Sequence, residues 1–290
     1  MATIASRQPP VGRIRWKKVR RYTAIYVVAI GAALVTLTPV IWLVLTSLRP
    51  QVEIISPSFH LLPKHATLQN FVDVFQRYKL APYVRNSIIV ALGTVITNLL
   101  IGPPAAYALA RYRFFGQGIF LVLIIFFRMI PLFAAIVPLF LIFSRLHLLD
   151  TYAGLIIAQT AFKLPFTIWL LRSFFLGIPR ELEEAARIDG SSTLGALFRI
   201  SLPLIRPGLA AVAVLAFLQT WNDLTVSLVL SSSTKTATLP LGLSKFVQEY
   251  GIAWGPMSAA GVLMFIPVLL FVFGAERFLI QGLAAGSVKE

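Results

Sequence analysis

The stretch PRELEEAARIDGSSTLGALFRISLPLIRPG, residues 179–208, is rich in charged side chains and lies between long apolar runs. The chain of 290 residues as a whole is 58% hydrophobic and only 13% charged, and its mean hydropathy is +0.82. A composition this apolar lies well outside the range of soluble domains and indicates a membrane protein. The charged stretch is therefore predicted to be a segment that leaves the bilayer.

Charge-poor runs of the length of a membrane span occur six times, over residues 22–48, 86–110, 118–143, 151–171, 207–230 and 256–275. Crossing about 30 Å of hydrocarbon takes roughly 20 helical residues. The first run is too long for a removed signal peptide and lacks a small-residue cleavage site. We expect an all-α membrane protein with six transmembrane helices in one domain over residues 22–275.

Lysine and arginine are shared unevenly between the predicted loops. With a cytoplasmic amino terminus, sixteen basic residues lie in inner segments and eight in outer segments. Because cytoplasmic loops carry the excess of Lys and Arg, both termini are predicted to be cytoplasmic. The domain is then flanked by a basic arm over residues 1–21 and a tail over residues 276–290. The charged inner loop covers residues 172–206, and the outer loops cover residues 49–85, 145–150 and 231–255.

Two further features concern the spans and the first outer loop. In that loop, Phe71, Val74, Phe75 and Tyr78 recur at helical spacing and predict a short amphipathic helix on the outer surface. Prolines fall inside several spans, where the freed carbonyls need a neighbouring helix or a water-filled cavity. Helices interrupted in this way favour a moving bundle over a passive anchor.

Catalytic and metal-binding signatures are scarce. The sequence has no phosphate-binding loop, and not even a Gly-Lys pair, so the chain is not expected to hydrolyse nucleotide. His60, His65 and His147 lie in outer loops without carboxylates at metal-ligand spacing, so no metal site and no catalytic residue are predicted. The absence of cysteine excludes disulfides. The net charge of +15 is attributed to topology-setting loops and not to nucleic acid.

Three charged residues, Arg128, Lys163 and Asp223, fall inside the predicted spans. A charge near the bilayer centre costs about 3 kcal/mol unless it faces a partner or water, so each is a candidate for a solute pathway. Asn222 precedes Asp223 in the polar stretch QTWND, whose side chains either hold helices together or contact a polyol. Two interpretations stay open: the cations neutralise Asp223 or satisfy carbonyls freed by prolines, or they line the pathway.

The charged stretch divides into two short helices. Pro179 suits the first turn of the first helix, three glutamates complement the positive end of its dipole, and Gly190 suits a left-handed C-cap. Ser191 or Ser192 caps the second helix, which Pro203 is predicted to end. Each helix is amphipathic. The apolar positions are Leu182, Ala185, Ala186 and Ile188, then Leu194, Leu197 and Phe198. Resting on the headgroups is the alternative, but an anionic leaflet would repel the glutamates.

At these residues the chain resembles a known family. EEAARIDG, followed nine residues later by ISLP, is similar to the EAA loop of permease subunits of binding-protein-dependent ABC importers. The matched residues are Glu184, Ala185, Ala186, Gly190, Ile200, Leu202 and Pro203. AAYALARYRF, LLDTYAGLI, WND and ERFLIQGLAAGSVKE extend the resemblance to the carbohydrate-uptake class and its MalG-type permeases. Glu290 departs from the usual terminal glycine, and Arg128 and Lys163 are atypical.

The resemblance implies the fold of a type I ABC importer permease in a bacterial or archaeal cytoplasmic membrane. It implies as partners a second, MalF-type permease, two ATPase subunits that hold ATP and Mg²⁺, and an external solute-binding protein that meets the third outer loop. The chain itself would carry no cofactor. Ala185 and Ala186 would pack closely on an ATPase, Glu184 and Asp189 would make polar contacts with it, and Gly190 would allow the turn.

The expected function is translocation of a sugar or oligosaccharide. In the maltose system the partner permease holds the sugar, so the resemblance does not assign solute contacts to Asn222 or Asp223. A polyol or glycerol phosphate is the alternative cargo, and Arg128 with Lys163 would suit an anion. A secondary transporter is the alternative from another class, against which the charged inner loop and the lack of a carboxylate-rich ion path argue. A scaffold without transport activity is a third interpretation.

Overall fold

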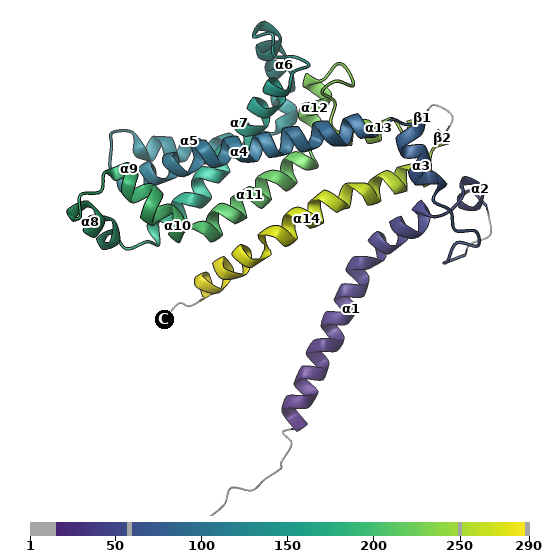
Figure 1. Cartoon of the computed structure of the whole chain (residues 1–290), viewed down its shortest axis with the longest axis horizontal. Helices are drawn as coiled ribbons and strands as arrows, with labels where there is room; N and C mark the ends of the chain where they lie inside the picture. The colour runs from purple at the N-terminus through teal and green to yellow at the C-terminus, as the bar shows by residue number, and fades with distance from the viewer. Residues whose placement is uncertain (1–15, 57–59, 249–250, 288–290) are drawn as a thin grey trace, which may run out of the picture.

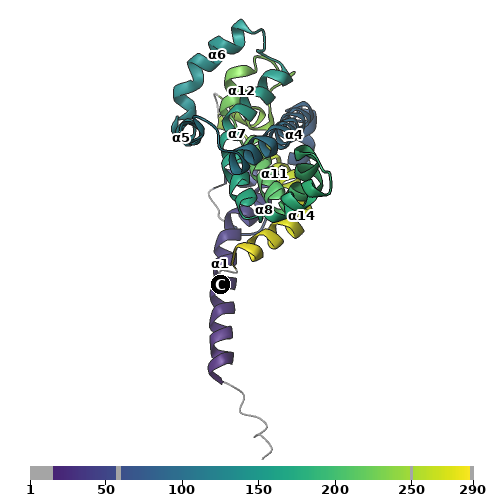
Figure 2. The same ribbon diagram turned by 90° about the vertical axis from the view of Figure 1, so that its left-hand side faces the viewer.

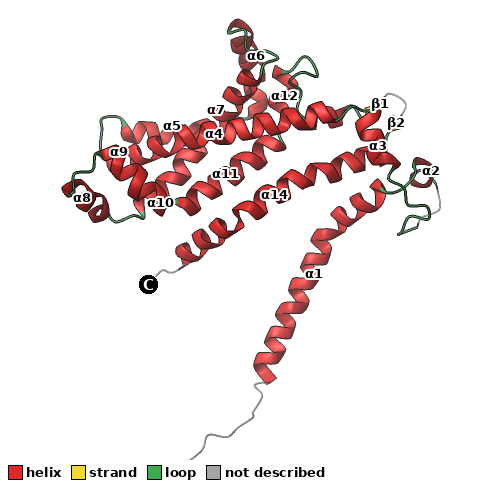
Figure 3. Cartoon of the chain, in the orientation of Figure 1, coloured by secondary structure: helices red, strands yellow, loops and turns green. Residues whose placement is uncertain are grey.

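The computed structural model describes residues 16–56, 60–248 and 251–287, which are predominantly helical (Figure 3). The longer helices are α1 (Trp16–Ser47), α4 (Ala81–Arg111), α5 (Gln117–Met129), α6 (Ile136–Arg145), α7 (Tyr152–Leu176), α11 (Arg206–Trp221) and α14 (Trp254–Ser287). The shorter ones are α2 (Gln51–Ile54), α3 (Gln69–Gln76), α8 (Arg180–Ile188), α9 (Thr193–Ala196), α10 (Leu202–Leu204), α12 (Thr225–Leu230) and α13 (Leu239–Ser244). A 3₁₀ turn, η1, covers Leu132–Ala135, and a π-helical turn, η2, covers Leu197–Ser201. Strands β1 (Val247–Gln248) and β2 (Gly251–Ile252) form a small antiparallel hairpin.

Four described helices, α1, α4, α7 and α14, are each long and apolar enough to cross a membrane. Two bent helix pairs raise the number to as many as six if each pair is one span. The structure is therefore that of a helical integral membrane protein.

The third apolar run, residues 118–143, is not one straight helix as a single span would suggest. It bends by 95° between α5 and the segment Leu132–Arg145. Pro131 has no N–H to donate and pushes the preceding residue, Ile130, into the extended conformation, with φ −70° and ψ 118°. The helix therefore ends at Met129 and restarts in a new direction.

The fifth apolar run, residues 207–230, is likewise divided. Helix α11 ends at Trp221, and α12 begins at Thr225 after a short irregular stretch. The Asp223 carboxylate accepts a hydrogen bond from the Val226 N–H at 2.9 Å, which satisfies one of the free donors at the start of α12. The polar side chains of QTWND therefore mark the break in this run.

The core is built where α4 packs along α7, with α11 between α4 and α14. Two glycines on α4 allow the close approach to α7: a methyl group on Gly93 would lie 2.5 Å from Ile156, and one on Gly102 would lie 2.4 Å from Thr167. Small residues at such crossings let helix backbones approach closely inside a bilayer. Trp221 is fully buried and donates from its ring nitrogen to the Met264 carbonyl at 3.1 Å.

Helix α1 stands apart from this core. It contacts α14, but most of its length extends away from the other helices (Figure 1, Figure 2). The most apolar part of the helix, within Val19–Ser47, has no buried residues. Most of its apolar surface is thus left for lipid or another protein.

The two ends of the bundle differ in character. Helix α8 lies at one end, and α2, α3 and the β1–β2 hairpin lie at the opposite end (Figure 1). The predicted amphipathic helix of the first outer loop is α3, in which Val74 is fully buried. Helix α14 continues to Ser287, past the predicted end of the sixth span at residue 275. Residues 1–15 of the predicted arm and Glu290 lie outside the described residues.

Candidate functional site

The charged stretch folds as a helical hairpin. Helix α8 starts after Pro179, which is its N-cap, and the chain turns at Gly190, whose φ of +88° is the left-handed conformation that favours glycine. The Ser192 hydroxyl accepts from the Gly195 N–H at 3.1 Å and caps α9. The predicted turn at Gly190 and the capping role of Ser192 are both present in the structure.

The second helix ends at Leu204, one residue after Pro203, where the sequence predicts its end. Pro203 lies within the first turn of α10. Proline is tolerated there because backbone N–H groups in the first turn have no partner within the helix. The helical path runs on to Leu204 and then bends by 77° into α11. Of the neighbouring motif residues, Ile200 and Leu202 are partly buried against the bundle.

Glu183 anchors α8 to the end of α4. Its carboxylate accepts hydrogen bonds from Arg111 at 2.8 Å, from the Ser201 hydroxyl at 2.7 Å and from the Tyr107 hydroxyl at 2.9 Å. Burial opposes ionisation of this group, but the hydrogen bonds from Arg111, Ser201 and Tyr107 outweigh it and hold the pKa of Glu183 below its usual value. The hairpin and α4 are therefore tied by a buried, charge-assisted contact.

The anchoring role of Glu183 was missed from the sequence, where it was one of three glutamates that complement the helix dipole. Only 6% of Glu183 is exposed. It lies three residues before the buried Ala186 and so shares its face of α8. A glutamate on the inward face of an amphipathic helix was the available signal. Its partner Arg111 lies 72 residues earlier, and no local pattern connects the two.

The opposite surface of the hairpin is exposed and partly apolar. Glu184, Ala185 and Asp189 are exposed. Four large apolar residues are exposed as well: Leu182 by 46%, Ile188 by 86%, Leu194 by 64% and Phe198 by 59%. Exposed apolar residues on an otherwise charged segment make it a candidate interaction surface. We call these four residues the apolar patch.

Inside the bundle, the structure joins two of the predicted pathway residues. The Lys163 ammonium donates to the Gln159 side-chain carbonyl, and the Gln159 amide donates to the Asp223 carboxylate at 3.0 Å. Lys163 and Gln159 are both buried. Asn222 instead donates to the Leu218 carbonyl of its own helix at 2.9 Å and is exposed. Gln159 was not singled out in the sequence, although it lies one helical turn before Lys163.

Arg128 is not part of this chain of hydrogen bonds. It lies near the end of α5, and its guanidinium carbon is 4.1 Å from the centroid of the Phe166 ring on α7. The residue is exposed on the surface of the chain. The structure therefore brings Lys163 and Asp223 together and leaves Arg128 in a different environment.

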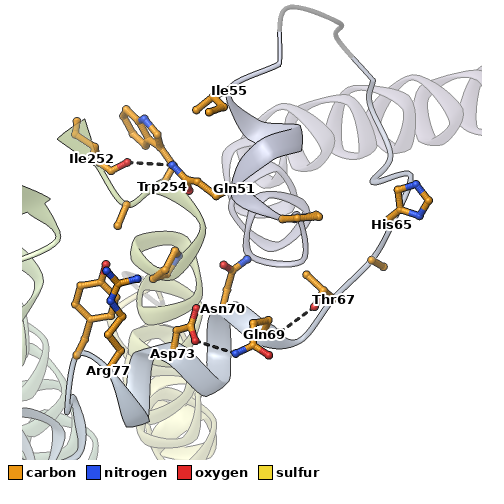
Figure 4. Close-up of a pocket in the computed structure, with 15 residues that line it drawn as sticks. Gln51, Ile55, His65, Thr67, Gln69, Asn70, Asp73, Arg77, Ile252 and Trp254 are labelled. Atoms are coloured by element: carbon orange, nitrogen blue, oxygen red, sulfur yellow. Dashed lines mark hydrogen bonds between the residues drawn. The ribbon is translucent and has the colours of Figure 1, made fainter. Parts of the chain in front are cut away.

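At the far end of the molecule from α8, a cavity of about 830 Å³ opens between α2, α3 and the start of α14 (Figure 4). Gln69 donates to Asp73 at 2.9 Å along one wall, and Trp254 lies on the opposite side. The Gln51 amide is 3.4 Å from the Ile252 carbonyl, a long contact between α2 and the β1–β2 hairpin. The cavity thus presents aromatic and polar groups together.

These features define a helical membrane protein with a charged hairpin at one end. Residues 99–284 match the family described as binding-protein-dependent transport system inner membrane component. The chain belongs to this family and is an ABC transporter permease.

Similar proteins cover most of the chain. It is 41% identical over 259 residues to a probable ABC transporter permease protein, y4oR of Sinorhizobium fredii, covering 89% of this chain and 92% of that protein. It is 36% identical over 253 residues to the sulfoquinovosyl glycerol transport system permease protein SmoH of Agrobacterium fabrum, covering 87% and 89%. A crystal structure of a bacterial ABC transporter involved in import of the acidic polysaccharide alginate matches with a TM-score of 0.76 at 26% identity, covering 93% of this chain and 99% of that one.

Proposed function

We propose that the chain is the membrane-spanning permease of an ATP-driven importer for sugars or oligosaccharides. It would cross the membrane six times with both termini in the cytoplasm, and residues 172–206 would form its EAA loop. Membership of the permease family supports this function, as do a relative named for sulfoquinovosyl glycerol transport and a similar structure named for import of the polysaccharide alginate. The same membership favours an importer subunit over a self-sufficient secondary transporter.

The observation that carries the proposal is the hairpin with one anchored face and one exposed face. The apolar patch and Glu184 offer a surface to a cytoplasmic ATPase subunit, while Glu183 ties the hairpin to α4 through Arg111. Movement of the ATPase would then pass to the end of α4 and, through the packing of α4 on α7, into the bundle. ATP and Mg²⁺ would be held by the ATPase partners, and this chain would serve transport without enzymatic activity of its own.

Two further partners are proposed at other surfaces. A second permease of the MalF type would cover part of α1, whose apolar surface the chain leaves unburied. A solute-binding protein would dock at the opposite end from α8, where the outer loops and the aromatic, polar cavity lie. With ATP bound, closure of the ATPases would favour an outward-facing state that accepts solute from the binding protein.

The coupling surface is tested by charging the apolar patch. Ile188→Asp should reduce copurification of the ATPase subunits with the tagged permease, because Ile188 is highly exposed and a carboxylate resists burial in an interface. The matched control is Ile55→Asp at the other end of the molecule, where the residue is also exposed. Ile188→Asp should lower solute uptake and Ile55→Asp should leave the ATPase attached. Full ATPase retention and normal uptake in Ile188→Asp would refute the coupling role.

A further inference from the structure

Arg128 is a charge at membrane depth that the chain itself does not neutralise. In the part of the chain that the structure describes, salt bridges join Arg49 to Glu53 and Arg111 to Glu183, and Arg128 takes part in neither. It lies in α5, whose sequence QGIFLVLIIFFRM is otherwise almost wholly apolar. An arginine in such a segment costs about 3 kcal/mol against hydrocarbon, so its exposed head must face water or another protein.

The backbone beside Arg128 leads to the same conclusion. Helix α5 ends one residue later, and the chain bends by 95° through Ile130, Pro131 and the 3₁₀ turn η1. Non-helical backbone at membrane depth is tolerated where it is buried in protein or lines a water-filled cavity. Ile130 and Phe133 are exposed on this chain, so it does not itself bury the bend. The charge and the broken helix both indicate that this face meets water or another protein, and not lipid, in the assembled transporter.

Arg128 shares a cavity of about 350 Å³ with residues of α7. The lining residues are Ile124, Ile125, Arg128, Pro165, Phe166 and Trp169. The rings of Phe166 and Trp169 stack with centroids 6.2 Å apart and 23° between their planes. Trp169 is 49% exposed, and its ring is thus open to a ligand. The cavity combines the exposed ring of Trp169 with one guanidinium, which lies over the Phe166 ring.

This combination has a defined chemical preference. The electron-rich face of an aromatic ring attracts the slightly positive C–H groups on the apolar face of a sugar ring. A guanidinium pairs with a carboxylate, sulfonate or phosphate through two parallel N–H donors. The volume lies near the lower end of the range for ligand pockets, about 300–1,000 Å³, and suits one sugar unit. Lys163 is buried and already donates to Gln159, so the anion would be recognised by Arg128.

We propose that the cavity between α5 and α7 is a subsite of the translocation path for a sugar unit that carries an anionic group, with Arg128 pairing with the anion, Trp169 stacking on the ring and Phe166 positioning the guanidinium. The inference rests on the proposed importer function and specifies the class of solute that this chain contacts. Arg128 lies apart from the Lys163–Gln159–Asp223 contacts, which join α7 to the irregular residues between α11 and α12.

The test uses the absence of cysteine from the chain, which makes any introduced cysteine on it unique. In the complex with the partner permease and ATPases, Ile125→Cys should react with a water-soluble maleimide. Phe126→Cys, which points to the other side of α5 from the cavity, is the control and should react much more slowly. Equal reaction at the two positions, or none at position 125, would overturn the water-lined subsite.

Ligand preference is then measured as protection of Ile125→Cys from the maleimide. The probes are glucuronate, glucose 6-phosphate and sulfoquinovose, with glucose as the neutral counterpart that shares their ring. At least one anionic probe should protect at a concentration about tenfold lower than glucose, as expected for one charged hydrogen-bonding pair. Adding Arg128→Gln should remove this preference, and Arg128→Lys should retain part of it because the charge remains.

The outcomes separate this inference from the proposed function. If no anionic probe protects better than glucose, or if Arg128→Gln leaves the preference unchanged, the anionic subsite is wrong. Copurification of the ATPase subunits with the same preparations reports on the importer function independently. Attached ATPases without anion preference would therefore reject the subsite alone, whereas a preparation that never holds ATPases would reject the proposed function.

Discussion

Glu183 and Glu184 are adjacent residues of the same type in opposite environments. Glu183 is buried and accepts hydrogen bonds from three side chains, whereas Glu184 is exposed. A step of one residue, about 100° around the helix, thus separates a side chain bound within the chain from one exposed at its surface. The pair allows stability and coupling to be tested by equivalent substitutions.

Glu183→Ala should lower the free energy of unfolding by about 3–5 kcal/mol, because it leaves the Arg111 guanidinium buried without its carboxylate. Glu184→Ala should change it by less than about 0.5 kcal/mol, since the residue is exposed. The measurement is thermal unfolding of the detergent-solubilised permease. Equal destabilisation by the two substitutions would contradict the anchoring role of Glu183.

The pH dependence of the stability difference between wild type and Glu183→Ala tests whether the charge of Glu183 causes that difference. The folded-state pKa of Glu183 lies below the value of 4.5 for an unperturbed glutamate. Its contribution is therefore fully present above about pH 4.5 and is lost as the pH falls through the folded-state pKa. The stability gap between wild type and Glu183→Ala should be constant from about pH 8 to about pH 5 and shrink in stronger acid. A gap that shrinks with rising pH would contradict this assignment.

At the scale of helices, the packing of α4 on α7 depends on glycines, which have no side chain to keep the helices apart. Gly102 faces Thr167, whose hydroxyl donates to the Asn98 side-chain carbonyl of α4 at 3.1 Å. Close approach and a buried interhelical hydrogen bond therefore occur at the same crossing. Because both need the backbones at a fixed separation, a single added methyl group affects both.

Gly102→Ala should destabilise the bundle by about 1–3 kcal/mol, since its methyl group would lie 2.4 Å from Thr167 and the helices must separate. The control is Gly31→Ala in α1, where no atom lies within 4 Å of the added methyl group. Thermal unfolding in detergent should show a loss for Gly102→Ala and none for Gly31→Ala. An unchanged melting temperature for Gly102→Ala would show that the α4–α7 crossing is looser than described.

At the scale of the whole molecule, α8 and the cavity near Trp254 lie at opposite ends of the bundle (Figure 1). Helices α4 and α14 both run from the end that carries α3 toward the end that carries α8. A membrane across the bundle would place α8 on one side and the cavity near Trp254 on the other. In the proposed importer, coupling between the two ends would therefore travel through the helices.

Orientation can be tested with single cysteines at the exposed positions Lys64 and Arg180, at the two ends of the molecule. In intact cells, Lys64→Cys should react with a membrane-impermeant maleimide, whereas Arg180→Cys should react only after the cells are permeabilised. The physical reason is that the bilayer separates the two ends from a charged reagent. The reverse pattern would place both termini outside and would exclude the EAA loop from contact with cytoplasmic ATPases.

The sequence by itself determined the features that depend on local chemistry. Apolar composition identified a membrane protein, helical spacing located α3 and α8, and Gly190 marked the one left-handed turn within the charged stretch. These inferences hold because hydrophobicity, helix periodicity and backbone φ are properties of a residue and its close neighbours. The EAA pattern was recognisable for the same reason, since its spacing is contained in one short segment.

The tertiary structure alone decided which distant groups meet. Glu183 pairs with Arg111, and Lys163 reaches Asp223 through Gln159, while Arg128 lies over Phe166 in a separate cavity. The sequence left the pairing of the three span charges open, because each could reach several partners at the same depth. The packing of α4, α7 and α11, set by glycines and by the breaks in the third and fifth apolar runs, fixes which of these partners is within hydrogen-bonding distance.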